Sequence, residues 1–361
     1  MSRISYMLPA FATDFSAAIS MISSMGGMSV LHAPSGCMGN YCGFDEPEWF
    51  GNPGLTYCSM LREDETIFGN DDILLGKIRN TCAKMSPSFV AVVGSPITAL
   101  IGTDLDGIAT LSEEETGIPT IAINTTGFDS YQVGLIKAFK SCVDKFSSDG
   151  SDEKRINLLG INKFDYHLTN DFGMPIDLLK RKGFKCIDVS CGCNLDLFKG
   201  IGGSEFNLAM STAGLGMSKY LKKRYGTEYG PLEYDEGRTR AGNGKRALII
   251  GDQVISNYIR QMIESEFGFE CDVGTLFEFD ASISESNDFK ADTEREMFDR
   301  LNSEHYDCVI SDPMIKRMIR YDTDFIPLAH PAVSSKIHWN EYVDPFKHLK
   351  GYLSSAMCGH P

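Results

Sequence analysis

Short apolar runs that end in Gly, Ser, Pro or Asn alternate along this chain with amphipathic stretches of helical periodicity. The apolar runs begin at residues 28, 89, 119, 156, 186, 246, 308 and 325. The helical patterns between them cover 71–85, 131–146, 175–184, 208–226 and 254–269. A strand that is buried on both faces has a continuous apolar sequence. The alternation therefore predicts an α/β, doubly wound fold in which helices cover both faces of parallel sheets.

Two polar segments interrupt this pattern, one at 145–155 and one at 234–246, and a new apolar run follows each of them. They divide the chain into three expected Rossmann-like domains, at 1–150, 151–242 and 243–361. Ligands of such sheets bind at the carboxyl ends of the strands. The turns that follow the apolar runs are therefore where we expect the chemistry.

Composition narrows the classes of partner. The 361 residues include 34 Lys and Arg against 49 Asp and Glu, a formal net charge of -15. Because an acidic surface repels phosphate backbones and anionic lipids, neither nucleic acid nor a membrane is an expected partner. The chain has no uncharged apolar run near 18 residues and no secretory signal at its start, which predicts a cytoplasmic protein. Its eleven cysteines are then not expected to form disulfides.

Nucleotide-binding and hydrolase motifs are absent from the sequence. It contains neither G-x4-G-K-[ST] nor a G-x-G-x-x-G that follows a strand, so it predicts no ATP or dinucleotide site in this chain. It also lacks a G-x-S-x-G after a strand, which argues against a serine hydrolase.

The stretch "LHAPSGCMGNYC" (31–42) carries the most suggestive cysteines, Cys37 and Cys42, and Cys58 follows another apolar-to-polar turn. Cys37 lies where a strand turns into a helix, and the N–H groups at a helix start lower a thiol's pKa and favour a metal-binding thiolate. A cubane iron–sulfur cluster needs four ligands, which are usually thiolates. These residues can supply up to three, and a partner the remainder. The alternative is that they are buried thiols without a metal.

A second group of cysteines, Cys186, Cys191 and Cys193, lies around a predicted strand end. Cys191 and Cys193 share one side of an extended chain, but the second pair that zinc usually requires is missing. A simple strand-end turn is the favoured interpretation.

Three histidines lie in turns where a ligand can bind. His32 ends the first strand beside Cys37, and it is either a functional residue or a hydrogen-bonded structural imidazole. His330 and His338 fall at the end of the last strand, where they can face a substrate. A turn-stabilising or surface role is favoured for both.

Taken in order, these pieces resemble the nitrogenase component 1 family. "LHAPSGC" (31–37) is similar to the family's His-Gly-Pro-x-Gly-Cys turn, whose cysteine is a cluster ligand. "EDETIFGNDDILLGKI" (63–78) resembles its Glu-x-Asp-x-Val-Phe-Gly-Gly segment, and 87–109 resembles the strand and turn with Ser/Thr-Cys and Ile-Gly-Asp-Asp. The resemblance spans nearly the whole chain and implies three domains of the component 1 type.

The chain also departs from this family at several ligand positions. Residues 8–14 lack the family's first cysteine, and its third falls on Pro96 or, with a small shift, on Ser95. The cysteine that anchors the molybdenum cofactor falls near Ser211 or Thr212. The resemblance therefore implies a divergent member that is not a true nitrogenase.

What the resemblance implies is an oxidoreductase subunit with an iron–sulfur cluster, 4Fe-4S or larger, shared with a second component 1-type subunit in a homo- or hetero-oligomer. Cys37 would be a ligand, Cys42 and Cys58 replacements for the lost ones, and His32 a support. A separate ATP-dependent iron protein would donate electrons, and a small unsaturated molecule or a tetrapyrrole would bind near Ser95, Cys191 and His330. The alternatives are a scaffold that passes on a maturing metal cluster without turnover, and a metal-free α/β binding protein.

Overall fold

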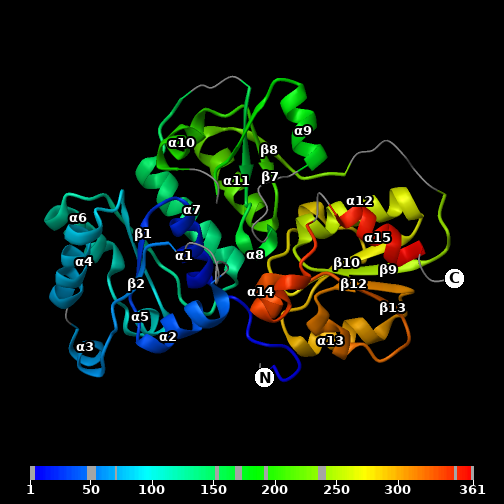
Figure 1. Cartoon of the computed structure of the whole chain (residues 1–361), viewed down its shortest axis with the longest axis horizontal. Helices are drawn as coiled ribbons and strands as arrows, with labels where there is room; N and C mark the ends of the chain where they lie inside the picture. Colours follow the sequence, from blue (N-terminus) through cyan, green and yellow to red (C-terminus); the bar gives the residue numbers. More distant parts are fainter. Residues whose placement is uncertain are drawn as a thin grey trace.

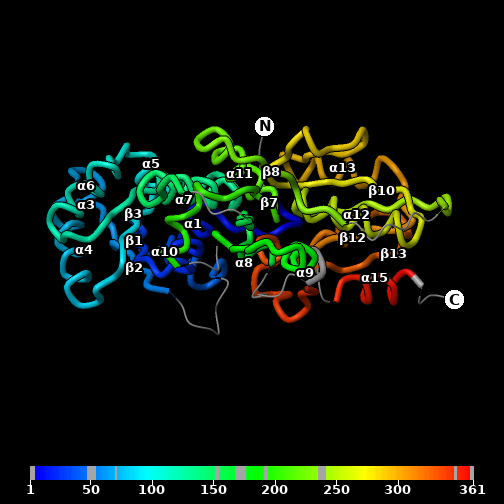
Figure 2. Tube along the Cα trace, turned by 90° about the horizontal axis from the view of Figure 1, so that it is seen from above, coloured from blue at the N-terminus to red at the C-terminus, as the bar shows by residue number. Residues whose placement is uncertain are grey.

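Three parallel sheets, each flanked by helices, make up the protein (Figure 1). The computed structural model describes residues 5–46, 54–69, 71–150, 154–166, 173–190, 194–234, 241–344 and 348–358. The first and third sheets lie at opposite ends of the molecule, and the second lies between them on one side. Seen from above, the molecule is flat and elongated (Figure 2).

The first sheet has the strand order β2-β1-β3-β4, and all of its strands are parallel. These strands are β1 (Met28–Leu31), β2 (Thr56–Cys58), β3 (Val90–Val93) and β4 (Thr120–Ile123). Successive residues of a strand point to opposite faces, so Val90 and Val92 pack in one apolar cluster and Ala91 and Val93 in another. Both faces are therefore covered, as the continuous apolar run at 89–93 predicts.

Helices of the first unit pack on the two faces of this sheet. Residues of α1 and α7 join one apolar cluster, and residues of α4 and α6 join the other. The helices are α1 (Asp14–Ser24), α2 (Ser35–Asn40), the π-helix η1 (Tyr41–Asp45), α3 (Glu63–Phe68), α4 (Asp71–Met85), α5 (Pro96–Ile101), α6 (Leu105–Thr116) and α7 (Tyr131–Phe146).

The second sheet has the order β6-β5-β7-β8, also with parallel pairs throughout. Its strands are β5 (Arg155–Leu159), β6 (Lys185–Asp188), β7 (Phe206–Ala209) and β8 (Glu228–Pro231). The helices of this unit are α8 (Lys163–Tyr166), α9 (Gly173–Arg181), α10 (Leu195–Lys199), the 3-10 helix η2 (Gly200–Gly203) and α11 (Thr212–Tyr225). Residues of α11 share an apolar cluster with residues of α7, which joins the second unit to the first.

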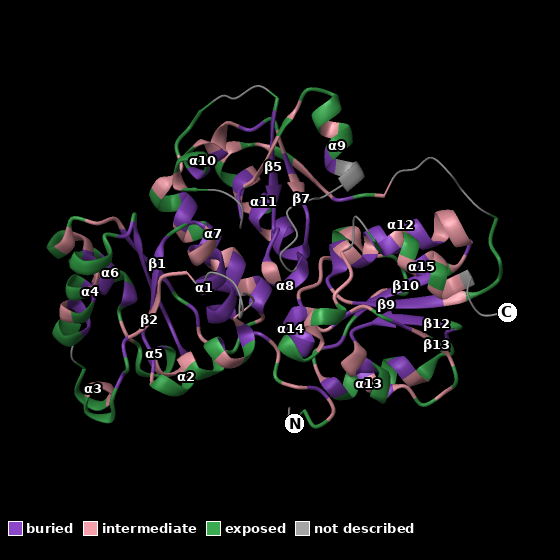
Figure 3. Ribbon diagram, in the orientation of Figure 1, coloured by how far each residue is buried: buried purple, intermediate pink, exposed green. Residues whose placement is uncertain are grey.

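The third sheet has the order β11-β10-β9-β12-β13. Its strands are β9 (Arg246–Ile250), β10 (Glu270–Thr275), β11 (Phe289–Lys290), β12 (Cys308–Ser311) and β13 (Asp324–Pro327). The helices are α12 (Gln253–Phe267), α13 (Glu294–Ser303), α14 (Pro331–Ser334), α15 (Leu349–Cys358) and the 3-10 helices η3 (Ala281–Ile283), η4 (Pro313–Met318) and η5 (Ser335–Glu341). The strands are mostly buried and the outer helix faces exposed, as Figure 3 shows.

These three parallel sheets confirm the predicted α/β, doubly wound class. The domain boundaries at 1–150, 151–242 and 243–361 remain a prediction, although each contains one of the sheets. No helix among the described residues combines the length and the apolar composition needed to cross a membrane.

Candidate functional site

Two neighbouring strands of the first sheet bring Cys37 and Cys58 to its carboxyl edge. Leu31, the last residue of β1, pairs with Cys58, the last residue of β2. Pro34 then adopts an extended conformation and directs the chain into α2, which places Cys37 in that helix's first turn. The chain continues directly into η1, where Cys42 lies. The end of β2 therefore places Cys58, and the segment after β1 places Cys37 and Cys42, at the carboxyl edge of the sheet.

The Cys58 thiol is held beneath the turn that leads to Cys37. Its Sγ donates to the Ala33 carbonyl oxygen at 3.2 Å and accepts from the Met60 backbone N–H at 3.4 Å. The Cys42 thiol contacts the Met38 sulfur at 3.4 Å. Cys37 and Cys58 are half-buried and Cys42 is exposed, so the three sulfurs lie at the boundary between the core and the solvent.

The pKa of each of these thiols is raised above its ordinary value. Burial is the main cause for Cys37, and the nearby Cys58 adds to it. Burial also raises the pKa of Cys42, followed by the charges of Glu46 and Cys58, and burial raises the pKa of Cys58 itself. The expectation that the helix start lowers the pKa of Cys37 is therefore wrong, because desolvation outweighs the helix N–H groups. Metal binding here would release thiol protons.

The donor set of this edge suits a thiolate-ligated group, but one chain does not complete it. The described residues contain no group of three or more His, Cys, Asp or Glu side chains already arranged to hold a metal ion. Cys37, Cys42 and Cys58 are all free thiols, the ligand type that iron–sulfur clusters use. The residues thus fit part of a shared ligand set.

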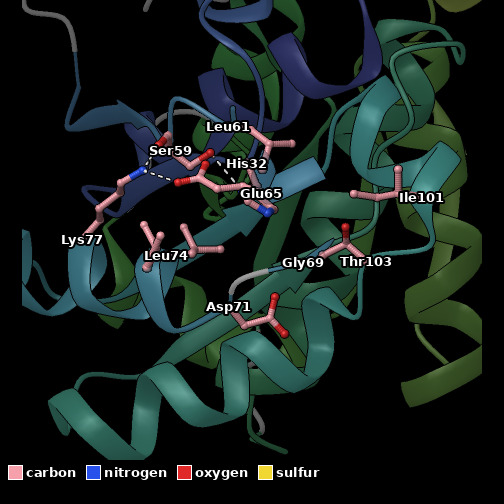
Figure 4. Close-up of a pocket in the computed structure, with 11 residues that line it drawn as sticks. His32, Ser59, Leu61, Glu65, Gly69, Asp71, Leu74, Lys77, Ile101 and Thr103 are labelled. Carbon is pink, nitrogen blue, oxygen red and sulfur yellow. Dashed lines mark hydrogen bonds and ion pairs between the residues drawn. The ribbon is translucent and has the colours of Figure 1, made fainter. Parts of the chain in front are cut away.

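His32 faces a cavity rather than the cysteines. Its ring is buried, and Nδ1 lies 2.8 Å from the Ser59 hydroxyl oxygen. The cavity measures about 30 Å³, and Figure 4 shows its polar lining, which includes Glu65, Asp71 and Lys77 but no cysteine. Burial lowers the pKa of His32, although the charges of Asp71 and Glu65 oppose this shift. His32 therefore connects the end of β1 to the end of β2, through its hydrogen bond with Ser59, the residue that follows Cys58.

Exposed apolar side chains occur in the segments that follow the carboxyl ends of β2 and β3. We call them the apolar rim: Met60, Ile67, Phe68, Ile73, Leu100 and Ile101. Phe68 is 84% exposed and Leu100 is 74% exposed, values that a folded chain rarely gives to large apolar residues in a group. Exposed apolar groups of this kind are typical of surfaces that bind a protein or a ligand.

The "EDETIFGNDD" segment builds part of this rim. The sequence predicts a capped helix from Asp71, and α4 does begin there. A second short helix, α3, precedes it and ends at Phe68, and the next residue, Gly69, has a φ of 69° that favours glycine. This turn exposes Ile67 and Phe68 instead of burying them.

Two positions at which the family resemblance lacks cysteine have structural roles. Ser95 caps α5, and its hydroxyl donates to the His32 carbonyl oxygen at 2.7 Å. Ser211 caps α11, and its hydroxyl donates to the Gly160 carbonyl oxygen at 2.7 Å. Both serines are completely buried and already bonded. Neither is available to a ligand without a rearrangement of its turn.

The remaining candidates are structural, exposed or outside the described residues. His330 caps α14 and lies 3.1 Å from an Asp165 carboxylate oxygen. His338 pairs with Glu341 on the surface at 2.9 Å. Cys191 and Cys193 lie outside the described residues. His330 therefore takes the turn-stabilising role that the sequence favours.

Sequence reasoning missed a buried polar network in which the three units meet. The Tyr131 hydroxyl donates to Asp165 at 2.6 Å, and the Gln132 amide donates to Asp252 at 2.7 Å. Asp252 also accepts from the Thr212 backbone N–H at 2.9 Å. Burial, and then the charge of Asp165, raises the pKa of Asp252 to about 7. The only sequence signal for this network is that Asp252 follows the apolar run at 246–250, as a helix cap does.

Asp45, the last residue of η1, should give the protein a measurable dependence of stability on pH. Its carboxylate accepts from the Ser16 hydroxyl at 2.7 Å and from the Asn40 amide at 3.1 Å. Burial raises its pKa to about 6, against 3.8 for an exposed Asp. The folded state thus binds this proton more tightly than the unfolded state, and its contribution to stability is lost as pH rises from about 4 through 6.

The variant Asp45→Asn should remove this dependence. We expect the wild type to lose roughly 1–3 kcal/mol across that window relative to the variant. Urea unfolding of both proteins at pH 4.5, 5.5 and 7 measures the difference. Asp64→Asn on the exposed face of α3 serves as the control and should follow the wild type. If the free energy of unfolding changed with pH by the same amount in the wild type and in Asp45→Asn, this assignment would be ruled out.

Comparison with known proteins supplies the family. The model of the nitrogenase component 1 type oxidoreductases matches residues 14–233, more than half of the chain. The chain belongs to this family. The matched range includes the cysteine edge, the apolar rim and all of the second sheet.

Relatives of two kinds occur within this component 1 family. The chain is 25% identical over 223 residues to the nitrogenase iron-molybdenum cofactor biosynthesis protein NifE of Nostoc sp., covering 59% of the chain and 45% of that relative. It is 26% identical over 155 residues to the nitrogenase molybdenum-iron protein beta chain of Methanothermobacter thermautotrophicus, covering 40% and 34%. The chain thus spans less than half the length of these curated relatives.

A solved structure shows that the fold extends beyond the family match. The structure titled "Nitrogenase Cp1 at pH 6.5" aligns with a TM-score of 0.72 at 15% identity, and the alignment covers 99% of this chain and 94% of that one. The third sheet, which lies outside residues 14–233, is therefore part of the same component 1 fold.

Proposed function

We propose that this chain is a component 1-type oxidoreductase subunit that holds an iron–sulfur cluster at an interface with a second subunit of the same type. The observation that carries the proposal is the position of Cys37, Cys42 and Cys58 together at one half-buried sheet edge. Cys37 would be the main ligand, and Cys42 and Cys58 would be additional ones. The cluster would be 4Fe-4S or larger.

The incomplete ligand set supports a shared cluster. A cubane cluster needs four ligands, and the described part of this chain holds no preformed group of even three. The apolar rim around the same edge, with Phe68 and Leu100 exposed, is suited to burial against a partner. A second subunit, either a copy of this chain or a different component 1-type chain, would add its ligands across that contact.

The proposed electron donor is an ATP-dependent iron protein. This chain has no phosphate-binding motif of its own, so the nucleotide would be bound and hydrolysed by the donor. When bound, the cluster would supply one-electron transfer at low potential. The residues of this chain would hold it in place, with His32 and Ser59 bracing the turn between the two strands. Reduced thiols are consistent with the cytoplasm as the compartment.

A cofactor-assembly scaffold is the second candidate function, and the relatives' names favour it. The NifE proteins that this chain resembles are named as cofactor biosynthesis proteins. A scaffold would use the same cysteine edge to hold a metal cluster and then release it to another protein. The two functions therefore use the same site: a reductase would pass on electrons from the cluster, whereas a scaffold would pass on the cluster itself.

An electron-transfer assay separates these two functions. The cluster-loaded protein is mixed anaerobically with a reduced iron protein and MgATP, and electron paramagnetic resonance follows the cluster. The reductase proposal predicts ATP-dependent reduction of the cluster, repeated turnover once an electron acceptor is added, and iron that stays with this chain. Transfer of the iron to an apo-protein, without repeated ATP use, would instead establish the scaffold.

A further inference from the structure

The four-residue helix α14 contacts all three units of the molecule. Its backbone accepts a hydrogen bond from Ala12 N–H, just before α1, at the Ala332 carbonyl oxygen (3.0 Å). It packs against α8 of the second unit, and Figure 1 shows it in the centre of the molecule beside α8. Ala332 and Val333 are buried in the apolar cluster that also contains α1 and α7. A helix in this place responds to any relative movement of the units.

The N-terminal end of α14 is hydrogen-bonded to the buried polar network through His330. His330 caps the helix through Nδ1, which accepts from the Ala332 backbone N–H at 3.3 Å, while its Nε2 lies 3.1 Å from Asp165. The imidazole also stacks on the Phe277 ring, with centroids 5.5 Å apart, and meets the Tyr131 ring edge-on. Both ring nitrogens thus have a partner, and the ring packs against Phe277 and Tyr131.

The other end of α14 reaches the helix that carries Cys42. Ser335 follows α14 directly, and its hydroxyl donates to the Phe44 carbonyl oxygen in η1. Ser335 has φ 53° and ψ -140°, a backbone conformation that is rare for residues other than glycine. The Lys336 ammonium lies 5.9 Å from the Phe44 ring centroid, so two successive residues hold the same residue of η1. A strained serine persists where the surrounding contacts fix it, and such residues often serve function.

Because η1 is a π-helix, the contact between Ser335 and Phe44 can affect the position of Cys42 in the same helix. A π turn contains one residue more than an α turn, and single π turns are frequent at functional sites. At its end, Asp45 is anchored to Ser16 within the first unit. The Phe44 carbonyl is the point at which the third unit holds the same turn. Relaxation to α-helical spacing would rotate Cys42 relative to Cys58 by about 100°, the angle per residue of an α-helix.

We propose that Ser335 is a positioning residue for Cys42: through the Phe44 carbonyl it holds η1 in its π form, so that the arrangement of the three units sets where the Cys42 thiol lies. This inference rests on the proposed role of Cys42 as a ligand, and it adds a link from the buried network at His330 to the cysteine edge. A change in the contacts between the units would move α14 and Ser335, and would thereby shift the Cys42 thiol without a change in the first sheet.

Alkylation of the cluster-free protein tests this link. The full chain is treated anaerobically with iodoacetamide under native conditions, and mass spectrometry gives a modification rate for each cysteine. Ser335→Ala removes the hydroxyl, and Ser335→Gly also relieves the backbone conformation. Both should change the Cys42 rate by about fivefold, the factor that corresponds to the loss of one net hydrogen bond. The rates of Cys37, Cys58 and Cys186 should stay at their wild-type values.

Ser334→Ala is the matched control, because that hydroxyl donates to the carbonyl oxygen of His330, the residue just before α14, and not to η1. It should leave all of the rates unchanged. An unchanged Cys42 rate in both Ser335 variants, or an equal rise for every cysteine, would overturn the proposal. Ser335→Gly keeps the test decisive if Ser335→Ala folds poorly. Because alkylation is measured on the cluster-free protein, its result does not depend on whether the assembled protein binds a cluster. The test can therefore fail while the proposed function holds, and the reverse.

Discussion

Purified anaerobically with its subunit partner, the Cys37→Ala variant is expected to retain no cluster iron. Cys37 lies in the first turn of α2, with Cys58 near enough to raise its pKa, so its loss removes the main ligand of the proposed set. Substitution of residues that only support a metal ligand already weakens binding by about 10–100-fold. Removal of a ligand should exceed that. Iron and sulfide assays, together with the visible absorption of the cluster, measure the loss.

Cys186→Ala is the matched control for this variant. Cys186 is also a half-buried free thiol, but it lies in β6 of the second sheet, far from the first. It should retain the iron content of the wild type. Cys42→Ala and Cys58→Ala should each lower the iron content, because both thiols belong to the same edge. Full iron in Cys37→Ala would show that the cluster, if present, is bound elsewhere.

The second large effect is expected from Asp165→Ala, at the centre of the network that joins the units. The carboxylate accepts from the Tyr131 hydroxyl at 2.6 Å and the Asn162 amide at 2.6 Å, and it lies 3.1 Å from His330 Nε2. Its removal leaves these buried groups without their acceptor. Breaking one partner out of a buried charged network typically costs about 3–5 kcal/mol. We expect a loss of that size in the free energy of unfolding.

Urea unfolding followed by circular dichroism measures this loss, with two comparison variants. Tyr131→Phe removes the hydroxyl that donates to Asp165 and accepts from the Gln132 amide at 3.2 Å, and it should cost about 1–2 kcal/mol. Asp196→Ala removes an exposed carboxylate paired with Lys199 and should cost at most about 0.5 kcal/mol. If Asp165→Ala matched the surface variant, the network would not be what holds the units together.

Local pattern was enough to predict most of the fold. Strands β3 and β9 are continuous apolar runs buried on both faces, and α7 and α12 have clear helical periodicity. The strands β2, β7, β8, β10 and β11 were not predicted, because they are too short or too polar to give a continuous apolar run. The helix expected from residue 208 is wrong at its start: Leu208 and Ala209 belong to β7, and α11 begins at Thr212. The short helix α3 was also missed, since its apolar residues face the solvent instead of a core.

The candidate site was predictable in position but not in detail. The turn at Cys37 stood out because a resemblance and a strand end coincide there. The buried network was not predictable, because Asp165 and Asp252 are 87 residues apart in sequence and interact only once the units have packed. The raised pKa of Cys37 was missed for the same reason, as burial depends on neighbours that a local pattern does not reveal.

Iron and acid-labile sulfide in the wild-type protein, measured after anaerobic purification alone and together with a second component 1-type subunit, test the central claim most directly. Mössbauer spectra of the same samples identify the ligands of the iron. The account predicts iron and sulfide in equal amounts with thiolate-ligated iron, at full content only when the subunit interface is assembled. Iron no higher than in the buffer control, in both the isolated chain and the assembled protein, would contradict it.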